Sequence, residues 1–143
     1  MYDVLKEEFI ELVEKEVHGE YKQKCYFHSI QVSQLARLYA LERGVNTDLA
    51  AIAGLYHDIG FYITRNSRNH GTLSADYLSK LLIKYNMPEA HRNMVLNAIR
   101  VHSDKASFHD ALSEVLKDAD VNAKYLEDMN AKYSLNEEKR IRY

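Results

Sequence analysis

The sequence predicts an all-α fold, a single-domain helical bundle that spans residues 1–143. Apolar residues recur at helical spacing through most of the chain, and no alternating β-branched run of strand length interrupts them. The chain has only 1 Pro and 5 Gly, so long helices with short connections are favoured. A length of 143 residues is enough for one core and too short for two comfortable domains.

The first two helices are predicted from apolar stripes. The first segment is amphipathic and is expected to end at Gly19. Its apolar positions are Val4, Leu5, Phe9, Ile10, Leu12 and Val13. The second helix is expected within HSIQVSQLARLYALERG, where Gly44 follows as a C-terminal cap and His28 lies near the helix start.

The third helix is expected in NTDLAAIAGLYHDIG, which begins with the capping residues Asn46 and Thr47. Its almost wholly apolar composition places it in the core, and Gly60 is expected to break it. A loop is predicted over residues 59–71. Thr72 is then expected to cap the next helix, LSADYLSKLLIKYN.

The C-terminal half continues the helical pattern. Pro88 stands where a first helical turn tolerates proline, and PEAHRNMVLNAIRVHS follows as an amphipathic helix. A second loop is predicted over residues 103–109, and the last strongly periodic element is residues 110–130. The charged tail, residues 134–143, is expected either to fray or to dock.

Composition limits the partners that the sequence suggests. With 19 Lys and Arg against 21 Asp and Glu, the chain is near neutral and lacks a basic block, so we expect no nucleic-acid polymer and no membrane partner. Cys25 is the only cysteine, which excludes an internal disulfide and predicts a packing role. Without a long apolar run or a signal-like N-terminus, a cytoplasmic location is expected. Nothing predicts the oligomeric state.

His57 and Asp58 form the anomaly of the sequence, because they end an apolar helix. Ionisable groups in apolar surroundings must be paired, hydrogen-bonded or metal-bound. Imidazoles and carboxylates together suit one or two divalent ions such as Mn, Fe, Co, Ni or Zn, and helical bundles often build such sites. The candidate ligands are His28, His57, Asp58, His70, His102 and Asp120.

The order of these residues resembles the HD-domain superfamily of metal-dependent phosphohydrolases, over about residues 24–126. The matching pieces are His28, H57-D58-I-G, H70-G-T-L-S-A, A98-I-R-V-H102 and D118-A-D120. The resemblance implies an all-helical fold, and it assigns the basic metal site to the first histidine, the His-Asp pair and the late aspartate. Asp120 is preferred for that last place, with Asp118 as the alternative.

The resemblance also assigns His70 and His102 to the extra histidines of members that bind two metals. Asp58 would then bridge both ions and be the central catalytic residue. Phe61 and Val121 stand where many members have a basic residue. Substitute phosphate contacts are therefore expected from nearby cations, namely Arg65, Arg68 and Lys105, with Arg100 as a further candidate.

The function predicted from this resemblance is a metal-dependent phosphohydrolase. Its expected substrate is a small phosphorylated molecule, a nucleotide or a phosphate ester, attacked by metal-activated water. Two alternatives remain open: a di-iron oxygenase of the same fold, and a non-catalytic sensor of metal or nucleotide. Tyr56 and Tyr62 could stack on a base but are expected to pack the core.

Overall fold

The computed structural model describes residues 1–141, which form helices and contain no strand, so the predicted all-α fold is confirmed. None of the helices in this range is long and apolar enough to cross a membrane. The cytoplasmic location and the domain boundaries stay predictions. The helices are α1 (Tyr2–Glu16), α2 (Glu20–Arg43), α3 (Thr47–Tyr56), α4 (Ile59–Thr64), α5 (His70–Lys84), α6 (Glu89–Val101), α7 (Ala111–Glu127) and α8 (Leu135–Glu138).

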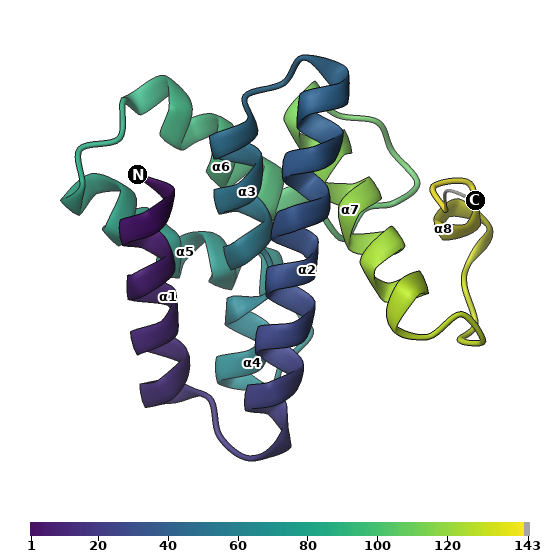
Figure 1. Ribbon diagram of the computed structural model, residues 1–143, viewed down its shortest axis with the longest axis horizontal. Coiled ribbons are helices and arrows are strands. Elements are labelled where there is room, and N and C mark those ends of the chain that lie inside the picture. The colour runs from purple at the N-terminus through teal and green to yellow at the C-terminus, as the bar shows by residue number, and fades with distance from the viewer. Residues whose placement is uncertain (142–143) are drawn as a thin grey trace.

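Helix α3 is the centre of the core, as its apolar composition predicts. Every side chain from Leu49 to Tyr56 is buried, and α1, α2, α6 and α7 all pack against this helix (Figure 1). The backbones of α2 and α3 approach closely at Gly54, where a Cβ atom would lie 2.7 Å from Ser33 Cα. The Ser33 hydroxyl donates to the Ala51 carbonyl at 2.7 Å. This contact brings the histidines of the two helices together.

The connection between α2 and α3 has the predicted caps. Gly44 takes the left-handed conformation with φ of 69°, and the Asn46 side chain accepts a hydrogen bond from the Leu49 amide. Helix α2, however, begins at Glu20, so His28 lies in its interior rather than near its start. The earlier start has a packing reason, because Cys25 is fully buried in the core, as expected for a packing residue.

The prediction of a loop over residues 59–71 is wrong, because α4 occupies its first half and α5 already begins at His70. Gly60 lies inside α4 and does not break it. A Cβ atom there would be 2.7 Å from the backbone nitrogen of Ser74, and the Ser74 hydroxyl accepts from the Gly60 amide at 2.9 Å. Gly60 therefore permits close packing of α4 on α5, and Thr72 lies within α5 instead of capping it.

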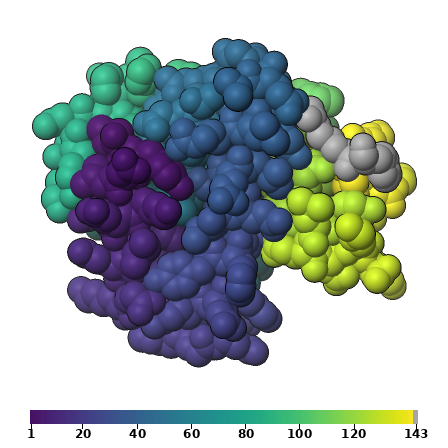
Figure 2. Space-filling model, in the orientation of Figure 1, coloured from purple at the N-terminus to yellow at the C-terminus, as the bar shows by residue number. Residues whose placement is uncertain are grey.

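The described part of the C-terminal tail docks. Ser134 and Glu137 form a capping box for α8. Arg140 then pairs with Glu114 at 3.0 Å and Asp118 at 2.9 Å, and it donates to the Lys105 carbonyl at 3.1 Å. Arg140 of the tail thus holds the backbone of the predicted loop between α6 and α7. In Figure 2 the C-terminal part lies beside α2, on the side away from α1.

We predict that Arg140→Ala destabilises the fold by about 3 kcal/mol, because it leaves the carboxylates of Glu114 and Asp118 undercompensated in a mostly buried site. Urea unfolding would measure the loss. The matched control is Lys139→Ala, since Lys139 is exposed next to it. Equal stability of the two variants would contradict this role for Arg140.

Candidate metal centre

All six residues predicted as ligands converge, and most come from helix ends. His28 and Asp120 project from the interiors of α2 and α7. The others stand at the junctions of helices: His57 caps the C-terminus of α3, Asp58 caps the N-terminus of α4, His70 opens α5, and His102 caps the C-terminus of α6. Five segments of the bundle therefore meet at one point.

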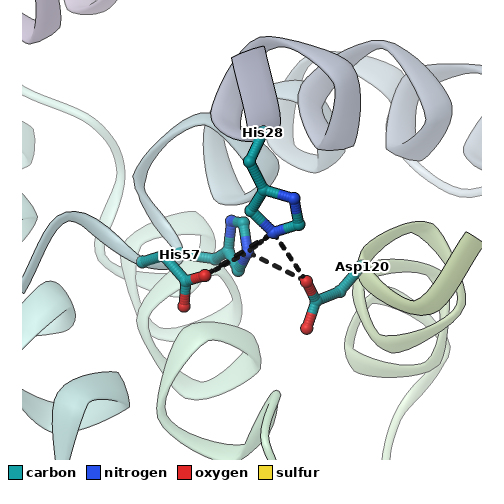
Figure 3. A group of neighbouring side chains, drawn as sticks. His28, His57 and Asp120 are labelled. Atoms are coloured by element: carbon teal, nitrogen blue, oxygen red, sulfur yellow. Dashed lines mark hydrogen bonds and ion pairs between the residues drawn. The ribbon is translucent and has the colours of Figure 1, made fainter. Parts of the chain in front are cut away.

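The first donor group consists of His28, His57, Asp58 and Asp120, whose ligating atoms all lie within 4.8 Å of one another. Asp120 Oδ1 lies 2.9 Å from His28 Nε2 and 3.2 Å from His57 Nε2. Figure 3 shows His28 and His57 turning toward Asp120 from separate helices. Asp58 completes the group through Oδ2, which is 3.2 Å from His57 Nε2.

The second donor group consists of Asp58, His70 and His102. Here the other carboxylate oxygen, Asp58 Oδ1, lies 3.2 Å from His70 Nε2 and 3.1 Å from His102 Nε2. Asp58 thus presents one oxygen to each group. This is the arrangement a carboxylate needs to bridge two cations.

The hydrogen bonds at Nδ1 fix the tautomers of three imidazoles. His57, His70 and His102 each donate Nδ1–H to the backbone carbonyl three residues earlier, at 2.7, 2.8 and 2.7 Å. Because a carbonyl oxygen only accepts, Nε2 of each neutral ring is left as an acceptor. Yet Nε2 of His70 and His102 lie 3.1 Å apart, both near Asp58 Oδ1. Facing acceptors require a proton or a cation between them, so the donor set fits a metal.

Glu127 contacts the ring nitrogen of His28 that faces away from the donor group, and it was not predicted from the sequence. Its Oε2 lies 2.8 Å from His28 Nδ1, so Glu127 orients His28 as the carbonyls orient the other rings. The signal available in the sequence was spacing, because Glu127 follows Asp120 by seven residues and hence lies on the same face of α7.

The centre also shifts the protonation of its histidines. Burial lowers the pKa of His28, but hydrogen bonds to Asp120 and Glu127 outweigh burial and raise this pKa to about 10. In His57 burial also opposes charge, and the negative Asp58 and Asp120 raise the pKa to about 9. In the metal-free protein both rings are therefore favoured as imidazolium cations at neutral pH, and a metal that binds Nε2 has to displace the proton there.

The carboxylates are charged under the same conditions. Burial acts to raise the pKa of Asp58 and Asp120, but neighbouring cationic groups hold both pKa values well below the usual value. The hydrogen bond with Asp58 raises the pKa of His70, whereas burial lowers the pKa of His102. Two largely buried anionic carboxylates thus require positive charge in their surroundings.

Of the cations predicted to contact phosphate, Lys105 lies at the centre, whereas Arg65 and Arg68 lie elsewhere. Lys105 Nζ lies 2.9 Å from Asp120 Oδ2. Arg65 instead donates to the His18 carbonyl and lies over the Tyr21 ring. Among the described residues, Arg68 is exposed and lines neither of the two cavities at the centre. Asp118, the alternative last ligand, lies outside both donor groups.

Two cavities open onto the centre, and both are lined by His28 and Asp58. The larger, of about 920 Å³, lies among α2, α4 and the end of α7 and has aromatic walls. The smaller, of about 610 Å³, is polar and is lined by His70, His102 and Lys105 among others.

Comparison with known proteins agrees with this geometry, since residues 25–129 match the family described as HD domain. The chain belongs to the HD-domain family. The resemblance seen in the sequence is thereby confirmed, and the matched range of this HD domain contains all six converging residues. No solved structure matches the chain.

Curated relatives of this HD domain are named Ribonuclease Y. The protein of Chlorobium luteolum is 31% identical over 104 residues, which cover 73% of this chain and 18% of the relative. That of Acetivibrio thermocellus is 35% identical over 101 residues, or 70% of this chain and 18% of the relative. That of Aquifex aeolicus is 40% identical over 85 residues, or 59% and 14%. The chain thus spans less than a fifth of these relatives.

These relatives contradict the expectation that no nucleic-acid polymer is a partner, because a ribonuclease acts on RNA. The expectation rested on a net charge of −2 and on the lack of a basic block. Net charge averages over the whole chain, however, and many acidic groups here are neutralised internally by histidine, lysine or arginine. A near-neutral total therefore does not exclude RNA.

We predict that Glu127→Gln weakens metal binding by roughly 10- to 100-fold, because the amide is a weaker acceptor for His28 Nδ1–H and leaves the ring less basic. Titration of the apo protein with Mn²⁺ or Zn²⁺ would measure it. Glu138→Gln, an exposed glutamate on α8, is the control. Unchanged affinity in the first variant would remove Glu127 from the centre.

We predict a pH profile for the metal-free protein. Protonated His28 and His57 stabilise the fold through their pairing with carboxylates. Because folding raises the pKa of both, this contribution is complete below about pH 6.5 and is lost as the pH rises through 9 to 10. The melting temperature in chelator should therefore fall between pH 7 and 10, while metal affinity rises over the same range. His28→Gln should flatten the fall, and His91→Gln should not. A level wild-type profile would contradict the charge pairing.

Proposed function

We propose that this HD domain is a metal-dependent phosphohydrolase that cleaves phosphodiester bonds of RNA. The observation that carries the proposal is the sharing of Asp58, one oxygen toward each of two donor groups, at the point where two cavities meet. The names of the relatives support RNA as the substrate class.

The donor set suits hydrolysis by water. A divalent ion held there would lower the pKa of a water toward neutrality and offset charge on the phosphoryl oxygens. Asp58 and Asp120, with their depressed pKa values, are weak proton acceptors near neutral pH. These carboxylates would instead bind the metal ions and supply negative charge. Two divalent ions would exceed the charge of these carboxylates and leave a centre that attracts a phosphodiester.

Lys105 is the cation best placed to contact the phosphate. Its ammonium group donates to Asp120 Oδ2 and to the His102 carbonyl, and it lines the polar cavity beside the centre. These two contacts orient the side chain before any substrate binds. Lys105 thus supplies a positive charge at the centre, to which the apolar side chains of Phe61 and Val121 add none.

We predict that Asp58→Ala loses both metal content and RNA cleavage, each to below about a tenth of wild type, because one residue serves both donor groups. The assay would use a labelled single-stranded RNA with Mn²⁺, and elemental analysis would follow metal content. Asp76→Ala, an exposed aspartate on α5, is the control and should match wild type.

The other outcomes identify the alternatives. Full metal occupancy in Asp58→Ala would contradict the assignment of this residue. RNA that binds the metal-loaded wild type without turnover would favour a sensor, and oxygen consumption by the iron-loaded protein would favour the oxygenase.

A further inference from the structure

We propose that the larger cavity is a nucleobase subsite, which binds the base on one side of the scissile phosphate. This inference rests on the proposed function and deepens it. The cavity of about 920 Å³ shares His28 and Asp58 with the metal centre, so a nucleoside linked to a phosphate at the centre would enter it directly. Its volume lies within the range typical of small-ligand sites.

The wall contributed by α2 is a continuous stripe along one helix face. Phe27, Gln31 and Gln34 follow one another at spacings of four and three residues around His28. Phe27 is 71% exposed although it is a large apolar side chain, so core packing does not account for it. An aromatic ring in that position offers a face on which a base can stack.

A second wall comes from α4, where Phe61 and Tyr62 line the cavity in edge-to-face contact at 5.4 Å between ring centroids. Tyr62 is 8% exposed, so its packing role is as predicted while one edge still reaches the cavity. A flat ring bound in this cavity would therefore have aromatic side chains of both α2 and α4 to pack against.

The polar groups of this cavity suit the edge of a base. The Gln31 and Gln34 amides each offer both donors and an acceptor, and within residues 1–141 neither makes a side-chain hydrogen bond. A base presents donors and acceptors side by side along its edge, which amides can pair. An apolar peptide side chain would offer the half-buried Gln31 and the exposed Gln34 no hydrogen bond, whereas a base would, so the cavity favours a base.

Among the described residues, the polar cavity on the other side of the centre is lined by no Phe, Tyr or Trp, and its only rings are the imidazoles of His28, His70 and His102, which belong to the metal centre. Lys105 and Lys124 line it together with serine and acidic groups, which suits a ribose-phosphate backbone. The two cavities therefore predict an asymmetry. The base on one side of the scissile bond is bound by stacking, and the base on the other side is not.

The test uses RNA oligonucleotides with an abasic residue placed on one side or the other of the scissile linkage. For wild type with Mn²⁺, we expect one abasic position to lower kcat/KM by about ten-fold and the other by less than about two-fold. Phe27→Ala should cause a similar loss on the intact RNA and remove the penalty of the sensitive position. Leu41→Ala, 70% exposed on the same helix outside the cavity, should behave as wild type.

Gln31→Ala, compared with the exposed Gln23→Ala, should change the preference among the four bases at the sensitive position. Equal penalties at both positions, or a Phe27→Ala defect that is the same on intact and abasic RNA, would overturn the subsite. If wild type cleaves no RNA, the proposed function fails. Binding of an RNA with a non-hydrolysable phosphonate linkage then decides the subsite by the same comparisons.

Discussion

One local interaction determines the centre: a histidine donates Nδ1–H to the carbonyl three residues before it. His57, His70 and His102 all do so. For His57 and His102 the accepting carbonyl belongs to the last turn of a helix, where carbonyls need capping partners; the Ile99 carbonyl also accepts from the His102 backbone amide. One hydrogen bond thus selects the tautomer and aims Nε2 at Asp58, and for His57 and His102 it also caps a carbonyl at a helix end. The packing of α3, α5 and α6 then needs only to bring those helix ends together.

Much of this arrangement could be predicted from the sequence, because it depends on local patterns. Helical periodicity predicts the bundle, and the resemblance of the ordered histidines and aspartates to the HD-domain superfamily predicts the converging residues. Glu127 and the helix α4 were missed for a different reason. The contact of Glu127 with His28 joins residues far apart in the sequence, and α4 is stabilised by the packing of Gly60 on α5, which no local pattern reveals.

Which basic residue lies beside the centre also depends on contacts between distant parts of the chain. Arg65 and Arg68 are closer in sequence to Asp58 than Lys105 is, yet Arg65 is bound to the His18 carbonyl and the Tyr21 ring. Lys105 reaches Asp120 because Arg140 holds the backbone of its loop. A residue beyond α7 thus fixes a charge beside the centre. Sequence distance is a poor guide where the C-terminal segment folds back.

Asp118 and Asp120 show how helix geometry and side-chain chemistry separate structural from functional carboxylates. Two residues apart on α7, they point in different directions, so only one can face α3. Asp118 faces Arg43 and Arg140, at 2.6 and 2.9 Å. Guanidinium groups do not release a proton near neutral pH, so these ion pairs stay charged. Asp120 faces imidazoles, which can exchange a proton for a metal. The partners, more than the carboxylates, determine which aspartate can serve a metal centre.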